Sequence, residues 1–278
     1  MGELRGWWRE FAGLVLPMAC GGCGRPREPS GVCARCAGEL YGRTPGRVRP
    51  MPEPAGLPAV YAAARYEDAP RAVLLAHKER GALGLARPLG VALARAVRGA
   101  VTAGAAVAYS PGLRVGDPAV ETRELVLVPV PSARRSVGAR GHDPARRIAL
   151  AAAGELRRGG TPARVAPVLR QRRAVGDQTG LGARERLSNL AGALDLVTGG
   201  RKLLADGKVV LVDDLMTTGA SLVEAARVIG ATGRPVTRAG GRPGPGTAGR
   251  QGPGKGGFPG LAAAVVAAPP KSFEINWN

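Results

Sequence analysis

The amino-acid sequence predicts an α/β protein with a mainly parallel sheet flanked by helices and a small cysteine-rich module at its N-terminus. Three observations support this fold class. Apolar, β-favouring runs end in proline or acidic residues at 125–130 and 209–213, helix-like apolar spacing lies before and between them, and all four cysteines lie near the N-terminus. The chain has 278 residues, 45% of them hydrophobic, which suffices for one α/β core and a small accessory module.

The cysteines form two Cys-x-x-Cys pairs separated by nine residues, and they predict a structural zinc site. Each pair can supply two ligands from one tight turn, and nearby glycines let the backbone bend toward the metal. Disulfides are the alternative, which the lack of an export signal disfavours. A thioredoxin-like redox motif would need only one such pair. The four ligands are Cys20, Cys23, Cys33 and Cys36.

Residues 42–58 contain five prolines and three glycines, which predicts a linker. We therefore divide the chain into a zinc-binding module, 1–45, and a larger domain, 46–278. In the larger domain, residues 70–80 and 83–98 have the apolar spacing of helices. His77 lies near the end of the first of these helices, and we expect it to be solvated.

Residues 125–131 read Leu-Val-Leu-Val-Pro-Val-Pro, a strand whose prolines turn the backbone out at the carboxyl edge of the sheet. The polar residues that follow, Ser132, Arg134 and Arg135, should lie at that edge, where open α/β sheets bind ligands. Asp143 is a natural N-cap and Pro144 a natural first residue for a helix that runs to about residue 158. Further strands are predicted at 165–169 and 262–268.

The most informative stretch is 209–222, in which four apolar residues precede Asp213 and Asp214 and a short turn then opens a helix at about Ser221. Unpaired N–H groups at a helix start bind anions, so this turn can wrap a phosphate. The acid pair suits vicinal hydroxyls or a magnesium ion, so the stretch fits a ribose 5-phosphate. The turn and helix start comprise Thr217, Thr218, Gly219, Ala220 and Ser221.

Two other interpretations fit parts of this stretch. Ser221 with Glu224 would also form a plain capping box. A Walker B strand would need a phosphate-binding Walker A loop, and the nearest candidate, 249–256, ends in glycine where serine or threonine should bind magnesium. We reject the Walker interpretation.

The 209–222 stretch closely resembles the phosphoribosyl pyrophosphate (PRPP) motif of type I phosphoribosyltransferases. The resemblance implies that the acid pair holds the ribose hydroxyls, with Mg²⁺, and that the loop holds the 5-phosphate. Over nearly the whole chain, the sequence resembles the ComF-like branch of that family, a zinc ribbon followed by a phosphoribosyltransferase domain. The shared features are the four cysteines, the Val-Pro-Val-Pro strand end, Arg140-Gly141, the Gln178-Thr179-x-Leu181 and Arg186-x-x-Asn189 segments, and the PRPP motif.

The resemblance implies a type I phosphoribosyltransferase-like fold in which 132–136 is the pyrophosphate loop and 178–189 is a mobile flap. Asp213, Asp214, Arg134 and Arg135 would then be catalytic, and Ser132, Gln178 and Arg186 would join the turn in binding substrate. The expected activity is transfer of phosphoribosyl from PRPP to a nucleobase or amine with release of pyrophosphate. The alternative is a non-catalytic PRPP- or nucleotide-binding accessory protein of DNA uptake that contacts single-stranded DNA or a helicase. An oligomer is compatible with either function.

The chain carries 40 basic and 21 acidic residues, a formal charge of +19, which favours anionic partners. Its aromatic content is only 4%, with no interleaved basic and aromatic patch for DNA. No membrane span or signal peptide is indicated, so we expect a cytoplasmic protein of nucleotide metabolism or competence. Residues 238–260 hold ten glycines and four prolines and depart from the family, and we expect a disordered insertion.

Overall fold

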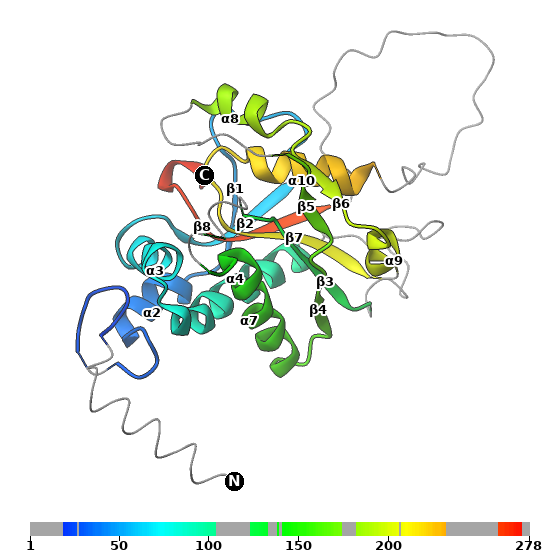
Figure 1. Cartoon of the computed structure of the whole chain (residues 1–278). Helices are drawn as coiled ribbons and strands as arrows, with labels where there is room; N and C mark the ends of the chain where they lie inside the picture. The colour runs from blue at the N-terminus through cyan, green and yellow to red at the C-terminus, as the bar shows by residue number, and fades with distance from the viewer. Residues whose placement is uncertain are drawn as a thin grey trace, which may run out of the picture.

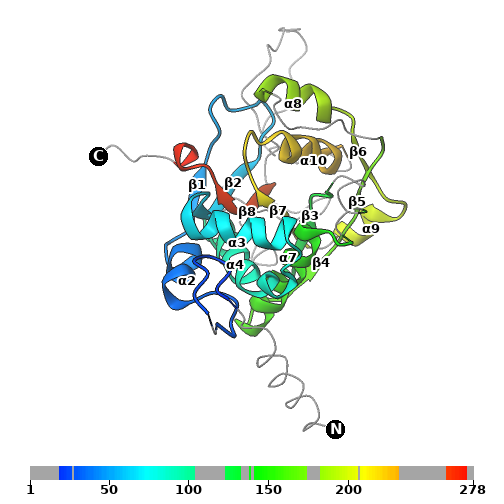
Figure 2. The same ribbon diagram turned by 60° about the vertical axis from the view of Figure 1, so that its left-hand side comes forward.

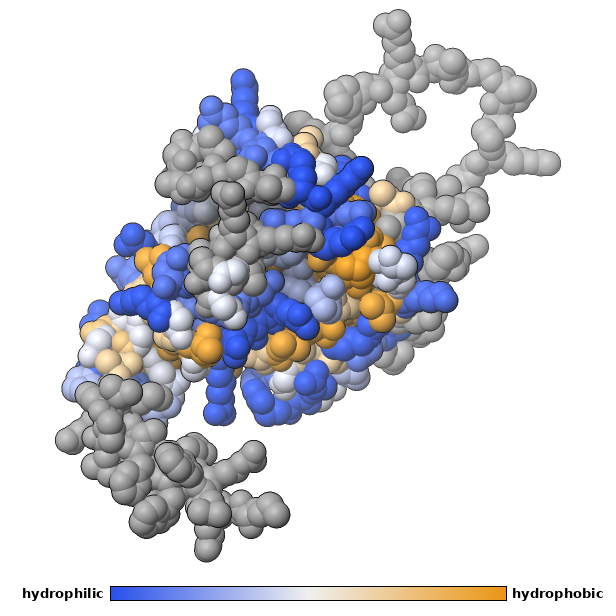
Figure 3. Space-filling view, viewed as in Figure 1, coloured by the Kyte–Doolittle hydropathy of each residue, from blue (hydrophilic) through white to orange (hydrophobic). Residues whose placement is uncertain are grey.

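The computed structural model describes residues 19–26, 28–103, 123–132, 138, 141–173, 182–205, 207–231 and 261–273. In these ranges the chain forms an α/β structure in which a six-stranded, mainly parallel sheet lies between helices (Figure 1). None of the helices in these ranges combines the length and hydrophobicity that a membrane span requires. The face shown in Figure 3 is largely hydrophilic, with hydrophobic residues exposed in separate groups.

The first part of the chain forms α2 (Ala34–Tyr41), β1 (Gly46–Val48), β2 (Ala59–Arg65), α3 (Asp68–Glu79), the 3-10 helix η1 (Leu83–Leu85) and α4 (Ala86–Thr102). The middle forms β3 (Leu125–Pro129), α7 (Pro144–Arg158), β4 (Ala163–Val165), β5 (Leu169–Gln171), α8 (Ala183–Leu190), β6 (Leu194–Leu196) and α9 (Gly200–Leu204). The last part forms β7 (Lys208–Leu215), α10 (Ala220–Gly230), β8 (Ala262–Ala268) and the 3-10 helix η2 (Pro270–Ser272).

The strand order of the main sheet is β1-β2-β8-β7-β3-β4, and β5 pairs with β6 in a separate two-stranded sheet. In the main sheet only β1 is antiparallel to its neighbour. All residues of β3 and β8 are buried, as expected of central strands covered by helices on both faces.

The two faces of the sheet are covered by different helices (Figures 1 and 2). Helices α2, α3, α4 and α7 share one hydrophobic core with Val210 and Val212 of β7. Helix α10 packs in a second core with Val209 and Leu211. Alternate residues of β7 therefore face opposite helical layers.

A topological switch point lies between β3 and β7. From β3 the chain passes through α7 to β4, on one side, and from β7 it passes through α10 to β8, on the other. The two crossover helices consequently lie on opposite faces, and the carboxyl ends of β3 and β7 are neighbours in the sheet. Ligands bind at such a point in open α/β sheets.

The structure confirms the predicted strands at β3, β7 and β8 and the predicted helices at α3, α4 and α7. The capping prediction for α7 is also correct, since the Asp143 side chain accepts a hydrogen bond from Arg146 N. The strand predicted at 165–169 is wrong, because β4 ends at Val165 and β5 starts at Leu169. Pro167 lies between them and cannot donate to a strand ladder.

The predicted linker at 42–58 is also partly ordered structure. Residues 46–48 form β1 on the edge of the sheet, and Arg49 N donates to Ser272 O at 2.6 Å. The sequence pattern did not reveal this strand, because prolines flank it on both sides and edge strands tolerate nearby proline. The predicted insertion at 238–260 lies outside the described residues.

We expect Gly90→Ala to destabilise the protein by about 1–3 kcal/mol, the usual cost of overpacking a core. A Cβ atom at Gly90 in α4 would lie 2.5 Å from the Cβ atom of Ala151 in α7. The matched control is Gly154→Ala in α7, whose added atom would meet only Arg158, at 3.8 Å. Urea denaturation should rank the control at or above the wild type and Gly90→Ala below it; equal stability of both variants contradicts this helix contact.

Candidate functional site

The polar end of β7 and the start of α10 form the centre of the candidate site. Met216 follows β7 directly and is anchored by its N–H, which donates to Ala267 O of β8 at 3.1 Å. Three residues then lead to Ala220, the first residue of α10. Thr217 is exposed and Thr218 is half-buried, so their hydroxyls are within reach of a ligand at the edge of the sheet.

The turn depends on Gly219, whose φ of 76° lies in the left-handed region that favours glycine. A Cβ atom there would also lie 2.7 Å from Leu57 Cδ1. Within the part of the chain that the structure describes, no side chain caps the start of α10. The N–H groups of its first turn therefore remain available to an anion, with the positive end of the helix dipole behind them.

The capping-box interpretation of Ser221 and Glu224 is wrong. The N-cap of α10 is Gly219, so Ser221 lies within the first turn of the helix. The buried Glu224 carboxylate instead accepts hydrogen bonds from Arg227 at 2.7 and 2.8 Å and from Leu194 N at 3.2 Å. Burial favours a raised pKa for Glu224, but these bonds hold the pKa below its usual value.

The two acids of β7 are in different environments. Asp213 is half-buried and its Oδ1 atom accepts a hydrogen bond from Asp214 N at 2.8 Å. Asp214 is buried, and its Oδ2 atom lies 3.0 Å from Lys78 Nζ. Burial raises the pKa of Asp213 well above its usual value; the charge of Asp214 adds to this rise and Lys78 opposes it. Asp213 therefore keeps its proton to a higher pH than an ordinary aspartate does.

Two further predicted site residues lie at the same edge. Ser132 follows β3, the parallel neighbour of β7, and its hydroxyl donates to Asp143 Oδ1 at 3.4 Å. Arg186 of α8 donates through Nη1 to Thr217 Oγ1 at 3.4 Å, so the end of the predicted flap reaches the turn. Arg134, Arg135 and Gln178 lie outside the described residues.

The sequence prediction missed two residues of α3 that belong to this region. His77 was expected to be solvated, but it is fully buried, with its ring 5.5 Å from the ring of His142. Burial lowers the pKa of His77, and His142 and Arg147 add to this effect. Lys78, beside it, pairs with Asp214. The helical pattern gave no signal for either role, because both depend on which elements α3 packs against.

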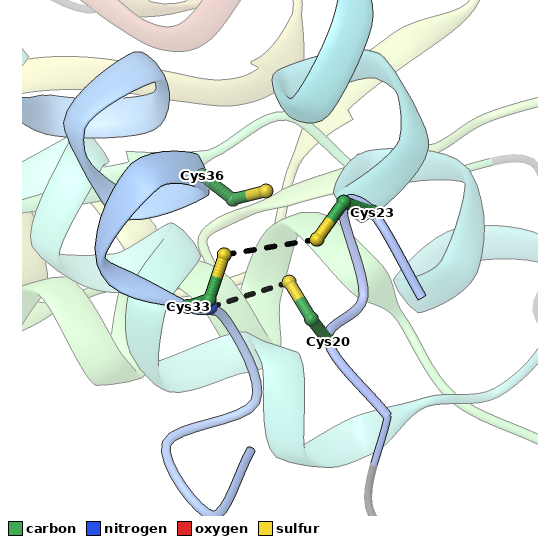
Figure 4. Close-up of side chains that lie close together, drawn as sticks. All are labelled: Cys20, Cys23, Cys33 and Cys36. Carbon is green, nitrogen blue, oxygen red and sulfur yellow. Dashed lines mark hydrogen bonds between the residues drawn. The ribbon is translucent and has the colours of Figure 1, made fainter. Parts of the chain in front are cut away.

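The four cysteines form a compact cluster between the loop at 20–23 and the start of α2 (Figure 4). Their Sγ atoms all lie within 4.8 Å of one another, and Cys23 Sγ is 3.7 Å from Cys33 Sγ. A tetrahedron with Zn–S bonds of about 2.3 Å has edges of about 3.8 Å, so this spacing suits a zinc ion. It is far too long for a disulfide, whose S–S bond is about 2.05 Å.

The chemistry of the donor set also fits zinc. Burial alone would raise the pKa of Cys20, but the N–H groups of Cys23, Cys33 and Gly22 stabilise its thiolate and lower the pKa to about 6. Burial and the neighbouring thiols raise the pKa of Cys36. Zinc binds thiolates, so binding at all four cysteines would release protons.

The cysteine cluster packs directly against the sheet-covering helices. Val32, Cys36 and Leu40 belong to the same hydrophobic core as α3 and α4. Glu39 Oε2 accepts a hydrogen bond from Ala69 N at the start of α3, at 3.4 Å. The cluster thereby fixes one end of α3, the helix whose other end carries Lys78.

Comparison with known protein families found no family that matches the chain, and comparison with characterised proteins found no match either.

We expect the purified protein to contain one zinc ion per chain and Gly22→Ala to lower its zinc affinity by about tenfold or more, a loss of about 1.4 kcal/mol. A Cβ atom at Gly22 would lie 2.7 Å from Cys36 Sγ. Gly38→Ala on α2 is the control, because nothing lies within 4 Å of its added atom. Metal analysis and competition with a chromogenic chelator measure both; metal-free protein with a Cys23–Cys33 disulfide would contradict the site.

We expect Asp213→Asn to change how the stability of the ligand-free protein depends on pH. Because folding raises the pKa of Asp213, its contribution to stability is complete below the ordinary carboxyl pKa and is lost as pH rises through the raised value. Urea denaturation from pH 4 to 8 should show the variant gaining on the wild type as pH rises.

Asp195→Asn is the control, because the contribution of Asp195 changes only below the ordinary carboxyl pKa, and this variant should run parallel to the wild type from pH 4 to 8. The N–H of Leu196 and then the Arg170 side chain lower the pKa of Asp195, so its contribution is present above the ordinary carboxyl pKa and lost as pH falls through the lowered value. If the stability of Asp213→Asn also runs parallel to that of the wild type across this range, folding does not raise the pKa of Asp213.

Proposed function

We propose that this protein binds PRPP with magnesium at the carboxyl end of β7 and acts as a type I phosphoribosyltransferase of the ComF-like kind. One observation carries the proposal: only five residues, 215–219, separate the acid pair from the start of α10, and the last of them is the left-handed Gly219, beside the switch point of the sheet. These two halves match the two ends of a ribose 5-phosphate.

In the proposed complex, the 5-phosphate lies against the turn. The N–H groups from Thr218 to Ser221 and the hydroxyls of Thr217, Thr218 and Ser221 are suitable donors. Hydrogen bonds to a charged partner contribute about 1.5–3 kcal/mol each, so a few of them support micromolar affinity.

The ribose hydroxyls lie against Asp213 in this proposal. Asp213 is the more exposed acid, and as a carboxylate it accepts hydrogen bonds from both vicinal hydroxyls. Its pKa is raised, so ligand binding must displace a proton at low pH, and PRPP affinity should increase as pH rises.

The proposed reaction transfers the pentosyl group. The bond from ribose C1 to the pyrophosphate oxygen breaks, and its electron pair leaves with pyrophosphate. The acceptor nitrogen forms the new bond to C1 with its lone pair and then loses a proton to water. Bound magnesium would neutralise charge on the leaving pyrophosphate. The residues that follow β3, Ser132, Arg134 and Arg135, would bind pyrophosphate. Gln178 and Arg186 would cover the substrate. A role in DNA uptake stays a prediction.

We expect Asp213→Asn to lower PRPP affinity about 10- to 100-fold, the equivalent of one or two charge-assisted hydrogen bonds. Binding of inorganic phosphate at the turn should not weaken. Isothermal titration calorimetry with magnesium present measures both ligands.

The paired variant is Thr218→Val, which removes a hydroxyl from the turn at nearly constant volume and should weaken PRPP and phosphate together. Pyrophosphate release with a panel of nucleobases then tests turnover. If the wild type binds no PRPP, or both variants bind it as tightly as the wild type does, the proposed function is wrong.

A further inference from the structure

Lys78 connects the helical layer to the acid pair. It lies in the last turn of α3, and its Nζ atom is 3.0 Å from Asp214 Oδ2. The Asp214 side chain is only 8% exposed, whereas the Lys78 side chain is 34% exposed. A carboxylate this buried needs a charged partner, and Lys78 is that partner.

Strand geometry explains why Lys78 meets Asp214. Asp214 continues the alternate positions of Val210 and Val212, which pack in the core that includes α3. Asp213 continues the positions of Val209 and Leu211, which face α10. The adjacent acids are thus presented toward different layers, and only the second is directed to α3.

The position of Lys78 is fixed from both ends of α3. At the start of the helix, Ala69 N donates to Glu39 Oε2, and Ala69 packs in the same core as Cys36. At the end of the helix, the buried ring of His77 has its Nδ1 atom 3.2 Å from Ala82 O and packs edge-on against His142. A lysine on so constrained a helix turn can hold its partner in one orientation.

We propose that Lys78 is a positioning residue of the PRPP site: it holds the Asp214 carboxylate against α3, so that Asp213 is the acid that meets the ribose hydroxyls. This inference rests on the proposed function and refines it, because it divides the acid pair into a ligand-binding residue and a supporting one. It also connects α3, fixed at its start by the cysteine cluster, to the ligand site through Asp214.

The competing assignment is that Lys78 binds the ligand itself through its exposed part. The two assignments differ in a double-mutant cycle. If Lys78 acts through Asp214, its removal has no further effect once Asp214 is replaced by asparagine. If Lys78 contacts PRPP, its removal weakens binding in either background.

The test uses calorimetry of the full chain with magnesium and PRPP, and separately with inorganic phosphate. Lys78→Met should weaken PRPP binding about tenfold, the order of one charge-assisted hydrogen bond. Lys78→Met/Asp214→Asn should bind PRPP within about twofold of Asp214→Asn alone, since coupled residues are not additive. Lys78→Arg should recover most of the affinity, and phosphate binding should stay unchanged throughout.

Arg71→Met is the matched control, because it removes a positive charge from the same helix at a position on its exposed side. It should leave PRPP affinity unchanged. Wild-type protein that binds phosphate but no PRPP refutes the proposed function. If the wild type does bind PRPP, two results refute only the assignment of Lys78. One is that Lys78→Met keeps full PRPP affinity, and the other is that Lys78→Met lowers the affinity equally in the wild-type and Asp214→Asn backgrounds.

Discussion

A sheet covered by helices on both faces has room for polar chemistry only at its edges and strand ends, and this constraint organises the molecule. Every residue of β8 and β3 is buried, and β7 stays apolar from Val209 to Val212 before its two acids. Charged groups on these strands would lose their hydration without compensation. The acids are therefore placed where β7 leaves the core, beside the uncapped start of α10.

The same constraint gives α3 its significance. This helix is held at its start by contacts with the cysteine cluster and at its end by the buried His77, and Lys78 follows directly. A zinc ion bound by the four cysteines would stabilise the end of α3 that lies far from the acid pair. The metal module and the ligand site are thus connected by a single helix in our account.

The sequence was sufficient for features that depend on local patterns. Leu125–Pro129 and residues 209–212 of β7 are uninterrupted apolar runs, and Asp143-Pro144 is a local helix-start signal, so β3, β7 and the start of α7 were predicted correctly. The acid pair with its glycine turn and the four cysteines also carry their information in short, specific spacings. These features locate the candidate site and the cysteine cluster.

Features that depend on contacts between distant segments were not predictable in this way. β2 is largely alanine, a weak strand signal, and it is a strand because it pairs with β8 about 200 residues later. His77 and Lys78 have ordinary helical positions, and only the packing of α3 against the sheet buries one and pairs the other with Asp214. Side-chain alternation in β7 predicts that Asp213 and Asp214 face opposite helical layers. It does not predict that Lys78 is the partner of Asp214.

The most direct test of the account is a crystal structure of the protein with PRPP and magnesium. We expect the 5-phosphate to accept hydrogen bonds from the backbone N–H groups of 218–221 and the ribose hydroxyls to donate to Asp213, with Asp214 still paired to Lys78. PRPP bound elsewhere, or with its phosphate away from the start of α10, would contradict the account.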